Sequence, residues 1–422
     1  MTGASRRTDW WRAARRILAV SAALWWLWAP GAAQAHKLNP CFRALIYRNG
    51  VLSEAPLRVR NLCPFAPSEF KAAVHEHMTN FAVSQYRGIR PFPTQRDSWE
   101  GKGDKWRFNY MSEPAWRKDG GALHRTRAIM FGNWWNDDPL MFLQGQGNDF
   151  RKGLFKLRQV FSERTRSHYA GGTANCKVAA DEHLARSSHF GALQHLHFMT
   201  SLAATRTPHE RVDDTRERAL LWIEFAYRVA IGEIAPDAAL TDADEQRLSL
   251  PPLARNLCLS DPGKRKVRSL FTRIGAGDPA DLEARNEQTP DVALGSILHV
   301  LQDSFSPAHA CRVERVVDGV RKALLADVYN YNEQDHEAHG ALDGYPAWLV
   351  EHAQSDGRAH RYANDPVAVG EWLLRAVDAK RPWDAVRDHL RATILEDDSR
   401  LASGTSGACI RREADDHLTR RR

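Results

Sequence analysis

The stretch Leu294–Arg312, LGSILHVLQDSFSPAHACR, constrains the fold more than any other part of the chain. On a helix, His299 and Asp303 lie one turn apart on the same face, among apolar packing positions. Pro307 ends such a helix and brings His309 round in a loop. Imidazole and carboxylate groups at this spacing can share or bridge zinc ions. A hydrogen-bonded His–Asp pair on a solvated helix face is the alternative interpretation.

The pattern HxxxDxxxxPxH, formed by His299, Asp303, Pro307 and His309, resembles the metal-binding core of a known superfamily. This superfamily comprises the zinc-dependent phospholipases C and the zinc nucleases that prefer single strands. Both groups are secreted, nearly all-helical enzymes with three zinc ions in one cleft. The resemblance implies a mostly α fold, a multi-helix phospholipase C/nuclease-like bundle, and two to three Zn²⁺ per chain.

Downstream, YNEQDHEAHGALDG contains His339 and Asp343, which are four residues apart and resemble the last His-xxx-Glu/Asp pair of the superfamily. Together with His309 they would complete one zinc site. His336 is the rival, but the residue four positions further on is Gly340, so it cannot form the same pair. A histidine-rich surface helix is the alternative.

Upstream, FGALQHLHFMTS offers His197 before a phenylalanine, like the His-Phe ligand of the superfamily, although the aspartate that often follows is missing. His195 and His189 compete for this role, and a histidine packed in the core is the alternative. The segment GNWWNDDP resembles the tryptophan-x-aspartate that supplies a carboxylate to the same zinc. It points to Asp137, with Asp138 as second choice, but NDDP is also a good turn sequence.

The segment KAAVHEHMTNFA resembles the superfamily's early histidine on its first helix and points to His75. His77 would face differently on a helix, so only one of the two should be a ligand. A solvated, charged helix face is the alternative. The chain departs from the family here, because members typically begin with a tryptophan that binds metal, whereas the expected mature chain begins at His36. The third zinc site is therefore the least complete.

The resemblance assigns each predicted ligand a role. Asp303 bridges two ions, His75 helps to hold the third ion, and Asp137 could also accept a proton from the attacking water. The remaining ligands fall into two sets: His197, His299 and Asp137 for one ion, and His309, His339 and Asp343 for another.

The rest of the chain predicts mostly helix and loop. A small N-terminal hairpin is expected around Asn49-Gly50, within the alternating stretch 42–60. Five helices are expected, at 68–85, 216–231 with Gly232 as C-cap, 290–305, 366–379 and 384–396. We expect a signal peptide over 1–35, a zinc hydrolase domain over 36–345 with an irregular insertion near 233–288 that includes a helix near Val267, and a C-terminal helical extension over 346–422.

The first 35 residues predict export. They combine an arginine-rich start, an apolar run from Ile17 to Trp28 and Ala33-Gln34-Ala35 as a cleavage site. The apolar run is shorter than the roughly 20 residues that a bilayer requires, which disfavours an uncleaved anchor. We therefore expect a periplasmic or secreted protein. Six cysteines permit up to three disulfides in an oxidising compartment, and Cys41–Cys63 is the favoured bridge among fifteen connectivities.

Charge and aromatic content bear on the substrate. Without the first 35 residues, which hold five arginines and one aspartate, the formal charge falls from +7 to +3, which disfavours nucleic acid. A phospholipid head group presents a single phosphate. Tryptophans could line an apolar approach to it or stack unpaired bases; these are Trp99, Trp106, Trp116, Trp134 and Trp135.

We therefore expect an exported zinc-dependent phosphodiester hydrolase with phospholipase C-like activity. A zinc nuclease that prefers single strands is the alternative. A non-catalytic exported binding protein on the same scaffold is the second alternative. The partner is a phospholipid or nucleic-acid phosphodiester, with peripheral membrane contact, and no stable protein partner is inferred.

Overall fold

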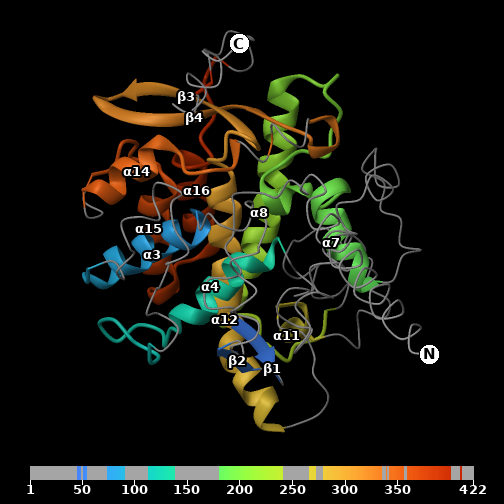
Figure 1. The fold of residues 1–422 in the computed structure, drawn as a ribbon, viewed down its shortest axis with the longest axis vertical. Helices are drawn as coiled ribbons and strands as arrows, with labels where there is room; N and C mark the ends of the chain where they lie inside the picture. Colours follow the sequence, from blue (N-terminus) through green and yellow to red (C-terminus); the bar gives the residue numbers. More distant parts are fainter. Residues whose placement is uncertain are drawn as a thin grey trace, which may run out of the picture.

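The computed structural model describes residues 45–48, 51–54, 74–90, 113–137, 180–240, 266–271, 279–334, 339, 342–355, 359–400 and 409–410. About 55 % of the interpretable residues are helical, which confirms the mostly α expectation (Figure 1). The α-helices are α3 (Val74–Arg87), α4 (Thr126–Trp135), α7 (Ala180–Phe190), α8 (Pro208–Ala230), α11 (Val267–Phe271), α12 (Pro279–Asp303), α14 (Ala347–Gln354), α15 (Pro366–Asp378) and α16 (Trp383–Ala392). Two short 3₁₀ helices are η5 (Gln194–His197) and η7 (Tyr331–Glu333).

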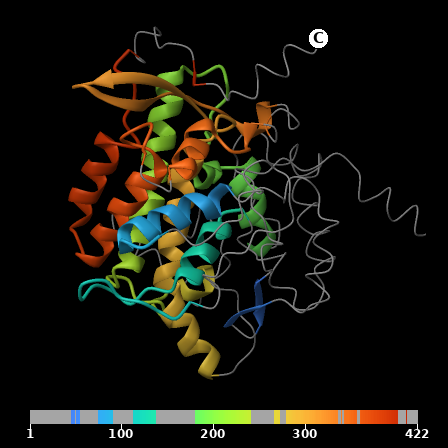
Figure 2. The same cartoon turned by 60° about the vertical axis from the view of Figure 1, so that its left-hand side comes forward.

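Helix α12 runs through the middle of the molecule, with α4 and α8 packed alongside it (Figures 1 and 2). The crossing of α4 and α12 depends on two glycines. A Cβ on Gly132 would lie 2.0 Å from the carbonyl oxygen of Val292, and one on Gly295 would lie 2.0 Å from that of Ile129. The two backbones are therefore in direct contact, which brings the end of α4 against the His299–Asp303 segment of α12.

Helix α12 is longer than the sequence predicted. The expected start at Pro290 is wrong, because the helix begins at Pro279 and continues through Pro290. Proline lacks the N–H that would bond the preceding turn, so its usual place is at a helix start. The region 233–288 also contains α11 at the position expected for a helix near Val267.

The helices of the C-terminal part belong to the same core as α3, α4, α8 and α12. Leu373 and Val377 of α15 and Leu390 of α16 are buried in one continuous hydrophobic cluster with Phe81 of α3. The Tyr227 hydroxyl of α8 also donates to the carbonyl of α15 residue 376, at 3.0 Å. The described helices beyond residue 345 therefore share this hydrophobic core.

Two helices begin with strong local signals. Thr207 and Glu210 form a capping box at the start of α8, and Gly232 follows the end of that helix with a φ of +80°. Asp365 caps α15 by accepting hydrogen bonds from the amides of Val367 and Ala368. The sequence predicted the start of α15 and the end of α8 at these places. The expected start of α8 at residue 216 is wrong, because the capping box begins the helix at Pro208. The expected end of the last helix at residue 396 is also wrong, because α16 ends at Ala392.

The structure contains two antiparallel hairpins among the described residues. The expected N-terminal hairpin is present as β1 (Leu45–Arg48) and β2 (Val51–Glu54). The second, β3 (Ala310–Val317) and β4 (Val320–Val328), was not expected. Its turn residues Asp318 and Gly319 have φ values of 52° and 78°, as a two-residue hairpin turn of this type requires. The alternating sequence around Asp318-Gly319 carried this signal.

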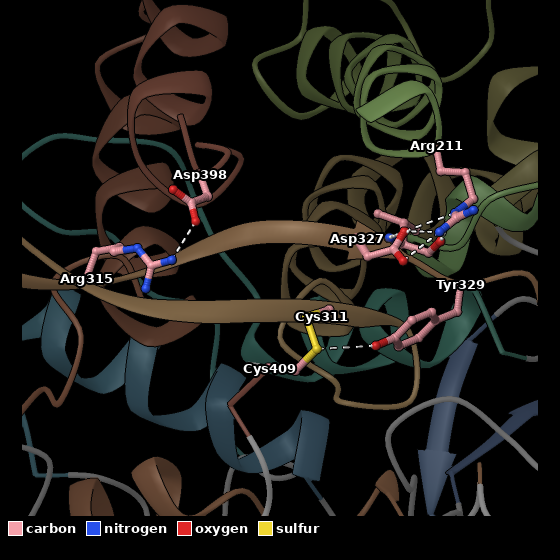
Figure 3. Close-up of a disulfide and its surroundings, with 8 residues drawn as sticks. Arg211, Cys311, Arg315, Asp327, Tyr329, Asp398 and Cys409 are labelled. Atoms are coloured by element: carbon pink, nitrogen blue, oxygen red, sulfur yellow. Dashed lines mark hydrogen bonds and ion pairs between the residues drawn. A yellow bond between two sulfur atoms is a disulfide. The ribbon is translucent and has the colours of Figure 1, made fainter. Parts of the chain in front are cut away.

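A disulfide fixes the C-terminal part of the chain to the second hairpin. Cys311 at the start of β3 is bonded to Cys409, 98 positions later, with a Cα–Cα distance of 5.1 Å (Figure 3). Nearby, Arg211 of α8 forms a bidentate ion pair with Asp327 of β4. The predicted Cys41–Cys63 bridge and the predicted signal peptide lie outside the described residues. Within the described part of the chain, no helix has the length and apolarity to cross a membrane.

Candidate metal centre

The structure brings all eight predicted ligand residues into one buried cluster. Each is at most 2 % exposed: His75, Asp137, His197, His299, Asp303, His309, His339 and Asp343. They come from α3, the end of α4, η5, α12, the turn before β3, and a short segment after η7. The alternative of a solvated helix face is therefore wrong for His75, His299 and His339.

Tertiary hydrogen bonds place the end of α4 beside η5. Asn136, the residue after α4, donates from its side-chain amide to the carbonyl of Leu196, at 2.7 Å. The same side chain accepts a hydrogen bond from the Ser296 hydroxyl of α12, at 2.6 Å. These two contacts hold the neighbouring Asp137 against His197, with 3.7 Å between a carboxylate oxygen and Nδ1.

Three ligand atoms converge beside α12. His197 Nδ1 lies 3.1 Å from His299 Nε2 and 3.1 Å from Asp303 Oδ2. His299 Nε2 lies 2.9 Å from the same carboxylate oxygen. A tetrahedral metal with ligands at about 2.0–2.1 Å separates its ligand atoms by about 3.3 Å. The spacing of these three atoms therefore fits one metal ion, with Asp137 as a further ligand.

The two oxygens of Asp303 face different histidines. While Oδ2 faces His197 and His299, Oδ1 lies 3.2 Å from His75 Nε2. The His75 ring also stacks on that of His299, with 4.2 Å between centroids. His75, Asp137 and His299 offer a second overlapping group of ligand atoms. Asp303 is thus placed so that each carboxylate oxygen can serve a different ion.

A separate group forms around Asp343. Its Oδ2 lies 3.0 Å from His339 Nε2, and its Oδ1 lies 3.7 Å from His309 Nε2. The amide of Asp343 bonds to the carbonyl of His339 at 3.2 Å, so the two residues share one helical turn as their spacing predicted. His309, His339 and Asp343 are together close enough to hold one ion.

Second hydrogen bonds fix which ring nitrogen of each histidine faces the cluster. The Nδ1 atom of His299 donates to the carbonyl of Asn133, and that of His309 donates to the carbonyl of His197, each at 2.7 Å. His75 Nδ1 bonds to Gln302 Oε1 at 2.7 Å. Since these oxygens accept the Nδ1 protons, each Nε2 directs its lone pair towards the cluster.

The Asp343 group is oriented in the same way. His339 Nδ1 bonds to the side-chain oxygen of Gln334 at 2.6 Å, which leaves its Nε2 facing the carboxylate. Ser306 donates its hydroxyl to Asp343 Oδ1 at 2.6 Å. In structural metal sites, such outer contacts set the tautomer and the direction of the ligands.

The electrostatics of the cluster favour a cation. Burial lowers the pKa of His299 to about 3 and that of His309 to about 4, so both rings are neutral at pH 7. Burial opposes ionisation of Asp303, but the facing His299 and His309 rings outweigh it and hold the pKa of this carboxyl well below its usual range. Buried carboxylates without a compensating positive charge are costly, and divalent metal ions would supply that charge.

Two further atoms of the cluster support this fit. His339 Nε2 and Asp303 Oδ1 are buried and make no hydrogen bond, although each lies within 3.2 Å of another ligand atom. Buried polar atoms are nearly always satisfied, so they indicate a missing partner. Nitrogen and oxygen donors of this kind suit a divalent transition metal. Several buried His/Asp groups of this chain could therefore hold metal ions.

The structure also distinguishes the rival residues. His77 bonds through Nδ1 to the Tyr345 hydroxyl at 2.9 Å, whereas His75 Nε2 lies 3.2 Å from Asp303 Oδ1. His75 is therefore the residue of α3 that is placed as a ligand. His189 was weighed only as a rival of His197, but the structure places it beside that residue, with 4.4 Å between ring centroids. His189 forms a further possible ligand group with Asp137 and His197. Asp138 and His336 lie outside the described residues.

Three tryptophans do not have the predicted location. Trp134 and Trp135 are 3 % and 1 % exposed, and Trp116 is also buried. Trp134 donates to a Glu76 carboxylate, and Trp135 stacks on Trp222. They are core residues and do not line an approach to the cluster. Trp99 and Trp106 lie outside the described residues.

Comparisons with known proteins gave no relative. No protein-family model matches the chain, and neither curated proteins nor solved structures gave a significant match.

Proposed function

We propose that the protein is an exported zinc-dependent phosphodiester hydrolase with a phospholipase C/nuclease-like helical bundle. The observation that carries this proposal is the convergence of eight buried His and Asp residues from separate elements, with the two oxygens of Asp303 facing different histidines. A solitary structural metal site would need three or four ligands. The larger shared cluster favours a multinuclear centre.

Zinc ions held by these residues would lower the pKa of bound water, neutralise phosphate oxygens and stabilise the leaving oxygen. His197, His299, Asp137 and Asp303 would hold one ion, and His309, His339 and Asp343 another. His75 and the second oxygen of Asp303 would contribute to a third. Asp137 would also accept a proton from the attacking water, because its carboxylate lies at the edge of the first group, 3.7 Å from His197.

For the substrate, we favour phospholipid head groups and phospholipase C-like cleavage. The formal charge of +3 without the first 35 residues offers few cations for a nucleic-acid backbone. Trp116, Trp134 and Trp135 are buried, so they can neither line an approach for a lipid nor stack on unpaired bases. A zinc nuclease that prefers single strands is therefore the alternative, and phosphatidylcholine and single-stranded DNA assayed side by side would separate the two.

Export is supported by the Cys311–Cys409 disulfide, because such bonds persist in oxidising compartments. Cleavage near Ala35 would give a mature chain that begins at His36. N-terminal sequencing of the exported protein tests this site, and an intact Met1 on the active protein would contradict it.

The proposed metal centre is tested by Asp303→Asn. Because this carboxylate would serve two ions, the variant should lose more than one zinc equivalent per chain and lose hydrolysis. Elemental analysis after dialysis against a weak chelator measures the first effect.

Asp343→Asn is the matched control, because its carboxylate would serve one ion and its loss should cost about one equivalent. Full zinc occupancy in the Asp303 variant would contradict the bridging role. At most one zinc per wild-type chain would instead support a non-catalytic binding protein on this scaffold.

A further inference from the structure

Two histidines meet at the opposite end of α3 from the metal centre. His352 of α14 and His360 of the loop before α15 lie with 4.6 Å between their ring centroids. Both contact Gln85, ten residues after His75 on α3. Ten residues span about 15 Å of an α-helix, so this pair does not belong to the cluster around Asp303.

The outer nitrogen of each ring already has an oxygen partner. His352 Nδ1 donates to the backbone carbonyl of Ala359, and His360 Nδ1 donates to the Asp365 carboxylate, each at 2.8 Å. This is the arrangement that fixes the tautomer of metal-binding histidines and directs Nε2 at the ion.

Both Nε2 atoms converge on one side-chain amide. Gln85 Nε2 lies 3.2 Å from His352 Nε2 and 3.4 Å from His360 Nε2. A half-turn of the amide about its last bond exchanges its nitrogen with its oxygen, which is a metal ligand. The resulting separations would match the spacing of about 3.3 Å between ligands of a tetrahedral ion.

The surroundings favour a bound ion that is still accessible. His352 is fully buried and packs edge-on against Phe81, whereas the His360 side chain is 27 % exposed. Because this side of His360 is exposed, water would supply a fourth ligand. Asp365 is fully buried and caps α15 with its other oxygen, so the outer contact of His360 is rigidly held.

We propose that Gln85, His352 and His360 form a separate transition-metal site that fastens the end of α3 to α14 and to the start of α15. Two imidazole nitrogens, one amide oxygen and water suit Zn²⁺, with Cu²⁺ and Ni²⁺ as ions of the same ligand class. The site lies outside the proposed hydrolytic centre and does not depend on the proposed activity.

His360→Ala tests the site directly. After equilibration with a small excess of zinc sulfate and gel filtration, the variant should carry one zinc equivalent less than the wild type, by elemental analysis. His389→Ala is the matched control, because this partly buried histidine of α16 stacks on Trp372 and should leave the zinc content unchanged. Equal zinc in the wild type and His360→Ala would overturn the proposal.

Gln85→Leu provides a second variant that keeps the side-chain size and removes the amide oxygen. It should weaken zinc binding at this site by about 10-fold or more, measured as the zinc retained after dialysis against a weak chelator. The comparison of His360→Ala with its parent should be repeated in an Asp303→Asn background. If His360→Ala loses one zinc equivalent in the Asp303→Asn background as well, that zinc belongs to the His352/His360 site. If it loses none in that background, the site is refuted.

Discussion

At the scale of single residues, the candidate centre depends on side chains that orient the proposed ligands without being ligands themselves. Gln302 illustrates this. Its Oε1 accepts hydrogen bonds from His75 Nδ1 at 2.7 Å and from the Asn133 side chain at 2.8 Å, while its amide donates to Thr79. One glutamine therefore orients a ligand of α3 from a position on α12, next to Asp303.

Gln302→Leu should weaken metal binding without removing a ligand. The leucine fills similar volume, but His75 loses the acceptor that fixes its tautomer, and outer-contact changes of this kind commonly cost about 10–100-fold in affinity. Zinc retained against a chelator series measures the effect. Gln288→Leu, which replaces a buried glutamine in the N-terminal half of α12, is the control, and equal losses in the two variants would contradict a specific role for Gln302.

The residues that face the metal positions were accessible from sequence, whereas their supports were not. Helical spacing places His299 and Asp303 on one face, and the resemblance assigned them as ligands. It also supplied His75 and His197 among several rivals. The glutamines and backbone carbonyls that orient them could not be predicted, because these contacts join positions up to 227 apart in the sequence. His189 was visible only as a rival, since nothing local places it beside Asp137.

At the scale of elements, local signals predicted helix ends better than helix lengths. The end of α8 before Gly232 and the start of α15 at Pro366 lie where they were predicted, because capping contacts are made within one turn. The expected start of α8 at residue 216 missed the capping box at Thr207. The start of α12 was missed because Pro290 is a strong start signal, and tertiary packing carries the helix past it. The β3–β4 hairpin was not predicted, although the Asp318-Gly319 pair within an alternating sequence is a hairpin signal.

The contact between α4 and α12 gives a prediction at this scale. Gly295→Ala would place a methyl group 2.0 Å from the Ile129 carbonyl, and a backbone atom cannot move aside as a flexible side chain can. The variant should lose about 1–3 kcal/mol of unfolding free energy, measured by urea denaturation. It should also lose zinc, because His299 is oriented by the nearby carbonyl of Asn133.

Glu283→Ala provides the control for this variant, because it introduces the same alanine at an exposed position of α12. It should change both the unfolding free energy and the zinc content little. A Gly295→Ala protein as stable as the wild type would show that the two helices can separate at no cost.

At the scale of the whole molecule, a buried charge network joins the N-terminal and C-terminal helices. His124 bonds to Asp291 of α12 at 2.8 Å and to Asp378 of α15 at 2.7 Å. The Tyr86 hydroxyl of α3 donates to the same Asp378 carboxylate. Burial lowers the pKa of His124, but the hydrogen bonds to the two carboxylates outweigh it and raise the value to about 9.

This network makes stability depend on pH in a defined direction. Because the folded pKa of His124 exceeds the unfolded value of 6.5, its contribution is complete below about pH 6.5 and is lost as the pH rises through about 9. The loss should be on the order of 3 kcal/mol. Urea unfolding of the wild type and of His124→Gln across pH 6–10 measures it, and parallel pH profiles of the two proteins would refute the assignment.

The Cys311–Cys409 disulfide closes a loop that contains β4, α14, α15 and α16, so its effect should reach the whole molecule. Beside it, the amide of Ile410 donates to the carbonyl of Arg312, which continues the attachment to β3. A bridge that closes a longer loop removes more conformational entropy from the unfolded chain. For a loop of roughly 100 residues this chain-entropy model gives a stabilisation of about 4.7 kcal/mol. Removing the bridge should therefore lower stability strongly.

The Cys311→Ser/Cys409→Ser double variant tests this expectation better than reductant alone, because the chain has four other cysteines. Under oxidising conditions its thermal midpoint should fall below that of the wild type by several degrees, while zinc content stays the same. His309 is two residues from Cys311 but is held by its own bond to the His197 carbonyl, so the metal centre does not depend on the bridge. Equal midpoints would mean that the bridge does not restrict the unfolded chain, and a joint loss of zinc would mean that β3 positions His309.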